Sequence, residues 1–137
     1  MGRSTNALLV YGYDLGGGDG DWQVQETGSF GLLDVPWWDQ EDDDPSFLEA
    51  AQTRLREAGV TGVEVHTHTS RDYPAYLLTV HCTTAYRGTP KRIDFDDLTR
   101  SQLAGDWDDQ LDAAMKALGL TSTQDSPGWL LASYAEL

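Results

Sequence analysis

The order of secondary-structure patterns along the chain predicts an α+β fold, with two helices packed on one face of an antiparallel sheet. Four short apolar or alternating runs are typical of strands, and two longer segments with an apolar residue every three or four positions are typical of helices. They follow one another as β-α-β-β-α-β, the order of a ferredoxin-like fold. The length of 137 residues fits one domain, so we expect residues 1–137 to form a single unit.

The first predicted strand is followed by a long acidic insertion. Residues from Ala7 to Tyr13 are almost all apolar or aromatic and end at Asp14 and a glycine cluster, which predicts a buried central strand. Residues 14–45 show little periodicity and hold ten acids but no Lys or Arg. A loop of this length is uncommon in a compact domain and is often functional.

The first helix has a clear start and a clear end in the sequence. Ser46 and Glu49 match a capping box, in which two side chains satisfy amide groups at the start of a helix. Gly59 can take the left-handed conformation that ends a helix. The residues expected on its buried face are Phe47, Leu48, Ala51, Leu55 and Ala58.

Two strands of alternating pattern follow and predict a hairpin. Pairing Val65 with Leu78 places apolar side chains opposite each other on one buried face. The same alternation puts Cys82 on the face of Leu78 and His81 on the opposite face. The two predicted strands are Val63–His68 and Tyr76–Tyr86.

A second helix is predicted to run to Leu118, where Gly119 provides a left-handed stop. Gly105 is expected to break this helix, and Asp106 to cap its main part. The last strand is expected at Trp129–Tyr134. The residues expected on the buried face of the helix are Trp107, Leu111, Ala114, Met115 and Leu118.

The charge of the chain restricts its partners. The formal net charge is −14, from 23 acids against nine Lys and Arg. Such a chain repels phosphate backbones, so we expect no direct nucleic-acid binding and favour a basic protein partner, including one that itself binds nucleic acid. No apolar run is long enough to span a membrane, and the single cysteine suits a reducing compartment, so a cytoplasmic protein without membrane contact is expected.

The histidines are the candidates for metal binding. His66 and His68 are spaced by two on one predicted strand, so their side chains can share a metal ion. In the predicted hairpin His81 lies roughly 13 Å from His66, four residues along at about 3.3 Å each, which is too far for a common zinc ion. Cys82 is expected to pack inside the sheet as an inert thiol. We therefore expect no cofactor, and no catalytic residue is singled out.

Two adjacent tryptophans beside a run of acids form the leading candidate site. Tryptophan is enriched at interaction hot spots, and surrounding acids steer a basic partner. Two structural roles are equally open for this segment: the tryptophans can anchor the loop to the core, and the last acids can favour the following helix through its dipole. A salt-adapted or GC-rich source would also account for the acidity. The predicted partner-binding residues are Trp37, Trp38, Asp39, Glu41, Asp42, Asp43, Asp44, Asp19 and Asp21.

The two ends of the chain carry a resemblance. The segments Leu9–Gly17 and Pro127–Tyr134 resemble small uncharacterised acidic proteins of actinobacteria and their phages. The resemblance covers only these ends and implies no particular activity. It favours a mobile-element protein, and small acidic phage proteins of this kind often block host nucleic-acid-binding proteins.

Three functions are compatible with these features. The first is a non-enzymatic interaction module that mimics nucleic acid and inhibits a basic protein through the loop at 14–44. The second is a small metal-binding domain or metal-assisted enzyme that uses His66, His68 and acids. The third is an oligomeric structural protein joined through an exposed sheet face. We also expect the acids of the loop and the seven acids between Asp94 and Asp112 to merge at one end of the fold.

Overall fold

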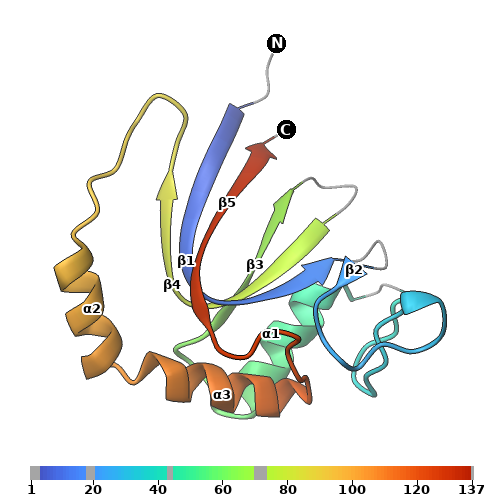
Figure 1. The fold of residues 1–137 in the computed structure, drawn as a ribbon. Coiled ribbons are helices and arrows are strands. Elements are labelled where there is room, and N and C mark those ends of the chain that lie inside the picture. Colours follow the sequence, from blue (N-terminus) through green and yellow to red (C-terminus); the bar gives the residue numbers. More distant parts are fainter. Residues whose placement is uncertain (1–3, 18–20, 43–44, 70–73, 137) are drawn as a thin grey trace.

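The chain folds as an α+β structure in which a curled antiparallel sheet carries helices (Figure 1). The computed structural model describes residues 4–17, 21–42, 45–69 and 74–136. Figure 1 shows α1 and α3 together at one end of the sheet and α2 at its side. The elements are β1 (Ser4–Gly17), β2 (Asp21–Trp22), a 3₁₀ turn (Ser29–Gly31), α1 (Phe47–Glu57), β3 (Glu64–Thr69), β4 (Pro74–Ala85), α2 (Phe95–Ala104), α3 (Trp107–Leu118) and β5 (Gly128–Glu136).

Strand β1 is the centre of the sheet, as predicted. It pairs with β4 along one edge and with β5 along the other, both antiparallel, and its end pairs with the short β2. Strand β3 lies outside β4 and meets β5 at the single pair Thr69–Tyr134, so the sheet curls into a half-barrel. The described residues form three helices where two were predicted, and the insertion adds β2, so the structure is more elaborate than the predicted two-layer arrangement.

A β-bulge at Val80 changes which side chains face the helices. Tyr11 pairs with His81 but Gly12 pairs with Thr79, so β4 holds one extra residue at this point. The pairing of Val65 with Leu78 is confirmed.

Beyond the bulge the predicted alternation is wrong. His81 stacks on Trp107 of α3 with ring centroids 5.3 Å apart, so it lies on the helix side of the sheet. Cys82 packs on the other side, against the cluster of Leu8 and Val10. Because a bulge inserts one residue without advancing the ladder, every later side chain of β4 changes face.

Apolar side chains form one cluster on each side of the sheet. The larger lies between the sheet and helices α1 and α3, where Phe47, Leu55, Leu111 and Leu118 are almost fully buried. The smaller lies on the opposite face and is formed by Leu8, Val10 and Leu77, with Cys82, Leu130 and Ala132 packed against it.

The helix ends follow the local sequence signals. The Ser46 hydroxyl accepts the amide N–H of Glu49 at 3.3 Å, and Gly59 follows α1 at φ 80°. Gly105 separates α2 from α3, as predicted. The predicted cap by Asp106 is wrong, because this residue precedes α3 in the left-handed region and its side chain makes no capping hydrogen bond. The expected face of α3 is buried in full, whereas Ala58 after α1 is exposed. No helix of the described residues is long and apolar enough to cross a membrane.

Replacing Gly12 by Ala is expected to lower the free energy of unfolding by about 3 kcal/mol, because the new Cβ would collide with the carbonyl group of Leu78. Gly128 is the matched control, since it pairs with Gly12 and a Cβ there has no heavy atom within 4 Å. Urea unfolding compares the two variants. Gly128→Ala should stay within about 0.5 kcal/mol of wild type, and equal stabilities of the two variants would contradict the close approach of β1 and β4.

Candidate functional site

The described part of the acidic insertion is tied to the segment that follows α3. The amide N–H of Gln25 donates to the Thr121 carbonyl at 2.8 Å, and that of Thr123 donates to the Gln23 carbonyl at 3.1 Å. The carboxylate of Glu26 accepts the Thr121 amide N–H at 2.7 Å. These long-range bonds fix the base of the loop against the body of the domain.

Three tryptophans hold the rest of the loop; together they are the tryptophan anchor, formed by Trp22, Trp37 and Trp38. Each indole N–H donates to an oxygen: Trp22 to Gln40 at 3.0 Å, Trp37 to the Leu118 carbonyl at 2.7 Å, and Trp38 to the Pro45 carbonyl at 2.9 Å. Their rings pack on Phe47 at centroid distances of 5.0, 5.7 and 5.2 Å.

The two adjacent tryptophans pack on the protein's own core in this conformation, so their role here is to hold the loop in place. Trp38 is 8% exposed, and the half-buried Trp37 lies under the guanidinium of Arg54, 6.0 Å from its ring centroid. An indole enclosed by the protein's own core offers little surface to a partner. Of the interpretations left open by the sequence, anchoring of the loop is the one that these contacts match.

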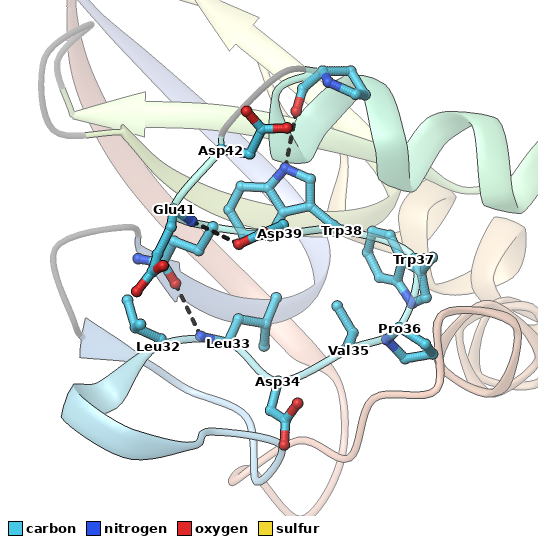
Figure 2. Close-up of a pocket in the computed structure, with 12 residues that line it drawn as sticks. Leu32, Leu33, Asp34, Val35, Pro36, Trp37, Trp38, Asp39, Glu41 and Asp42 are labelled. Carbon is cyan, nitrogen blue, oxygen red and sulfur yellow. Dashed lines mark hydrogen bonds between the residues drawn. The ribbon is translucent and has the colours of Figure 1, made fainter.

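The carboxylates around the anchor point outward. Asp34, Asp39, Glu41 and Asp42, which we call the acidic rim, are exposed and line a hollow of about 500 Å³ (Figure 2). Within the described part of the chain none of them has an ion-pair partner. The acidic rim is therefore an array of negative charges without ion pairs, of which Asp39 also accepts the amide N–H of Glu41 at 3.0 Å.

The predicted partner-binding residues fall into three groups. Asp39, Glu41 and Asp42 come together in the acidic rim, and Asp21 is exposed at the start of β2. Trp37 and Trp38 belong to the tryptophan anchor. The remaining three, Asp19, Asp43 and Asp44, lie outside the described residues.

Sequence reasoning missed three residues of this site, namely Trp22, Asp34 and Gln40. Gln40 accepts both the indole N–H of Trp22 and the amide N–H of Leu33, at 3.0 and 2.9 Å, and so links two parts of the loop. Asp34 joins the acidic rim only because the loop folds back on itself. No local pattern distinguishes such residues, since the partners of Gln40 lie 7 to 18 positions away along the chain.

The second group of acids does not merge with the loop. Trp37 binds the carbonyl of Leu118 at the C-terminal end of α3, whereas Asp106, Asp108 and Asp109 lie at its N-terminal end. The twelve residues of α3 span roughly 18 Å. Figure 1 accordingly shows the loop after β2 on the opposite side of the molecule from α2. The expectation of one merged acidic surface was wrong.

A hydrogen-bonded tyrosine lies between the sheet and the start of α3. The hydroxyl of Tyr11 donates to the Asp108 carboxylate at 2.6 Å and accepts from the Gln102 amide at 3.0 Å. Burial, with the bond to Asp108, raises the pKa of Tyr11 to about 12. Such a phenol keeps its proton at neutral pH, so this network joins β1, α2 and α3 and supplies no base.

The histidines do not converge on one point. His66 lies 3.4 Å from the Glu64 carboxylate, and the Nε2 atom of His68 has no hydrogen-bond partner within the described chain. Burial lowers the pKa of His68, and a weaker effect of Asp14 opposes it. His81 lies on the opposite face of the sheet. Among the described residues no three His, Cys, Asp or Glu side chains are arranged to hold a metal ion.

Comparison with protein-family models, curated proteins and solved structures finds no match for this chain. The resemblance to small acidic proteins of actinobacteria and their phages stays a prediction.

The stability of the fold should depend on the phenol of Tyr11 at high pH. Its pKa is raised from 10.0 to about 12, so the folded chain holds this proton more tightly than the unfolded chain. The stabilisation it contributes is complete below pH 10 and is lost as the pH rises towards 12. Urea unfolding across this range should show that the free energy of unfolding falls more steeply with pH for wild type than for Tyr11→Phe. Equal dependence of the two unfolding free energies on pH would contradict the network. A pKa of Tyr11 near 10, measured from the absorbance of the phenolate, would also contradict it.

Proposed function

We propose that this protein is a non-enzymatic interaction module that binds a basic protein surface through the acidic rim. One observation carries the proposal: exposed carboxylates without ion-pair partners in the described chain stand on a loop that the tryptophan anchor holds in place. Carboxylates that served the fold alone would be expected to pair with bases or cap helices.

The rigidity of the loop is what makes these charges useful for binding. A preorganised surface loses little conformational freedom when a partner docks, so more of the interaction energy appears as affinity. Unpaired charges of one sign also accelerate the encounter with a partner of opposite sign. The acidic rim combines both properties. The acids at the start of α2 and α3 differ, because they lie at helix N-termini, where the helix dipole already stabilises their charge.

The class of partner follows from the charge pattern. Carboxylates held on a fixed backbone present negative charges as a nucleic-acid backbone does, and a groove built for phosphates can accept them. We therefore propose a nucleic-acid-binding protein as the partner and its inhibition as the outcome. Such a role suits a phage or mobile-element protein.

We also propose that the long strands keep the ferredoxin-like connectivity. In support, β5, β1, β4 and β3 are neighbours in that order, and each of these three pairings is antiparallel. The strand β2 and the contact between β3 and β5 are additions to that arrangement.

Neutralising the acidic rim is expected to abolish binding of the partner. The variant Asp39→Asn/Glu41→Gln/Asp42→Asn should lose the protein that wild type captures from a lysate at low salt. The matched control replaces three exposed acids outside the loop, Glu57→Gln/Asp96→Asn/Asp109→Asn. Each variant removes three negative charges from the net charge of −14, so only the position of the charges differs.

The control variant should retain the partner, and high salt should weaken its capture by wild type because screening reduces surface attraction. Equal loss in both variants would show that bulk charge, and not the acidic rim, is responsible. A double-stranded oligonucleotide added as competitor should displace the protein if the partner uses its nucleic-acid groove. Undiminished capture by the rim variant contradicts the proposal.

A further inference from the structure

One part of the sheet edge has no strand beside it. Residues His81–Ala85 of β4 pair with β1, but β3 begins at Glu64 opposite Thr79 and no described strand follows on that side. Figure 1 shows β1 on one side of this end of β4 and, on the other side, no strand but the coil that leads to α2. In an antiparallel strand alternate residues direct their N–H and C=O groups to each edge. The outer edge therefore presents an unpaired row of backbone donors and acceptors.

This edge lacks most of the features that prevent pairing with other chains. Proteins commonly protect an open edge with lysine, proline or another charged side chain. The stretch Val80–Ala85 carries no formal charge and no proline, although 23% of the chain is charged. Its one protective feature is the bulge at Val80, which lies at the end next to β3. An unprotected edge of this kind is a template for strand addition.

A notch lies beside the free edge where β3 begins. Its volume is about 440 Å³, and its lining includes Gly62, Glu64, His66 and the edge residues from Thr79 to Cys82. The side chain of Glu64 is 66% exposed, and its contact within the described chain is His66 at 3.4 Å. The notch thus has an acidic side that is open to an incoming cation.

A basic turn follows the other end of the same edge. The Tyr86 carbonyl accepts the Thr89 amide N–H at 2.9 Å, and the Arg87 amide N–H donates to the Asn6 side chain at 3.2 Å, so the turn is fixed to β1. Its basic residues Arg87, Lys91 and Arg92 are exposed and make no ion pair among the described residues.

We propose that the free edge of β4 binds the same edge of a second copy, in an antiparallel pair around a two-fold axis. Centring the pair on Thr83, which the two-fold axis places opposite its own copy, puts Ala85 of the second copy opposite His81. The chain of the second copy then continues towards the start of β3, where its Arg87 reaches the notch beside Glu64. A two-fold axis repeats this ion pair, so each protomer supplies both the base and the acid.

The charge distribution favours a second copy over an unrelated strand. The paired segment is uncharged, so two identical edges meet without like-charge repulsion across the ladder. The two ends of the edge carry opposite charges, Glu64 at one end and the basic turn at the other. An antiparallel copy of the same edge places each acid beside the other copy's base, so the attraction occurs twice. The proposal is independent of the acidic rim, because it uses neither the loop nor the tryptophan anchor.

Charge reversal at the two ends provides the test. Light scattering and sedimentation equilibrium of the whole chain should show a concentration-dependent dimer. Glu64→Arg and Arg87→Glu should each weaken dimerisation by about tenfold or more, because each turns two attractions into two repulsions. The double variant Glu64→Arg/Arg87→Glu should recover wild-type dimerisation. Matched controls are Glu57→Arg and Arg56→Glu on α1, which change the net charge equally and should leave the dimer intact.

Far-ultraviolet circular dichroism of every variant separates loss of dimer from loss of fold. Hydrogen exchange adds a second measure, since the amides of Val80–Ala85 that face the free edge should become more protected as the concentration rises. A chain that stays monomeric at all concentrations overturns the proposal. A dimer that the single reversals leave unchanged, or that the double variant does not recover, also overturns it. The acidic-rim variant should dimerise as wild type does, so this test can fail without affecting the proposed function.

Discussion

The close approach of β1 and β4 at Gly12 is the constraint on which the arrangement of the sheet depends. A side chain at this position would overlap the Leu78 carbonyl, and one step further the bulge at Val80 interrupts the ladder. A bulge bends a strand and increases its local twist. The curled sheet, the reversal of faces beyond Val80 and the end of the pairing between β3 and β4 all occur at this point. The stacking of His81 on Trp107 and the free edge of β4 are its consequences.

The loop shows how a strongly acidic segment becomes ordered. The carboxylates of the acidic rim stay in water, because burying an unpaired charge carries a desolvation penalty that nothing beside them would offset. Its order comes from the tryptophan anchor, which buries large apolar rings on Phe47 and gives every indole N–H an acceptor. Apolar and charged side chains therefore have separate roles along one segment: the first fix the backbone, and the second define the surface that a partner meets.

The acidity of the chain forms separate surfaces because of the length of α3. The acidic rim lies near its C-terminal end, whereas Asp108 and Asp109 lie in its first turn. Asp96 and Asp97 lie in the first turn of α2, and the helix dipoles favour the acids at both places. The sheet between them carries few charges, and its open edge is flanked by one acid and one basic turn. The molecule thus presents an acidic surface suited to a foreign basic protein and a neutral edge suited to its own copy.

The sequence by itself determined the features that local chemistry controls. The Ser46 cap, the glycines after α1 and α3, the buried face of α3 and the pairing of Val65 with Leu78 depend on neighbours or on simple alternation, and they were predictable. The tertiary structure alone decided the bulge at Val80, the face of His81, the burial of Trp38 and the membership of Asp34 and Gln40 in the site. These features arise from contacts between distant segments, where steric fit and the satisfaction of buried polar groups override any local pattern.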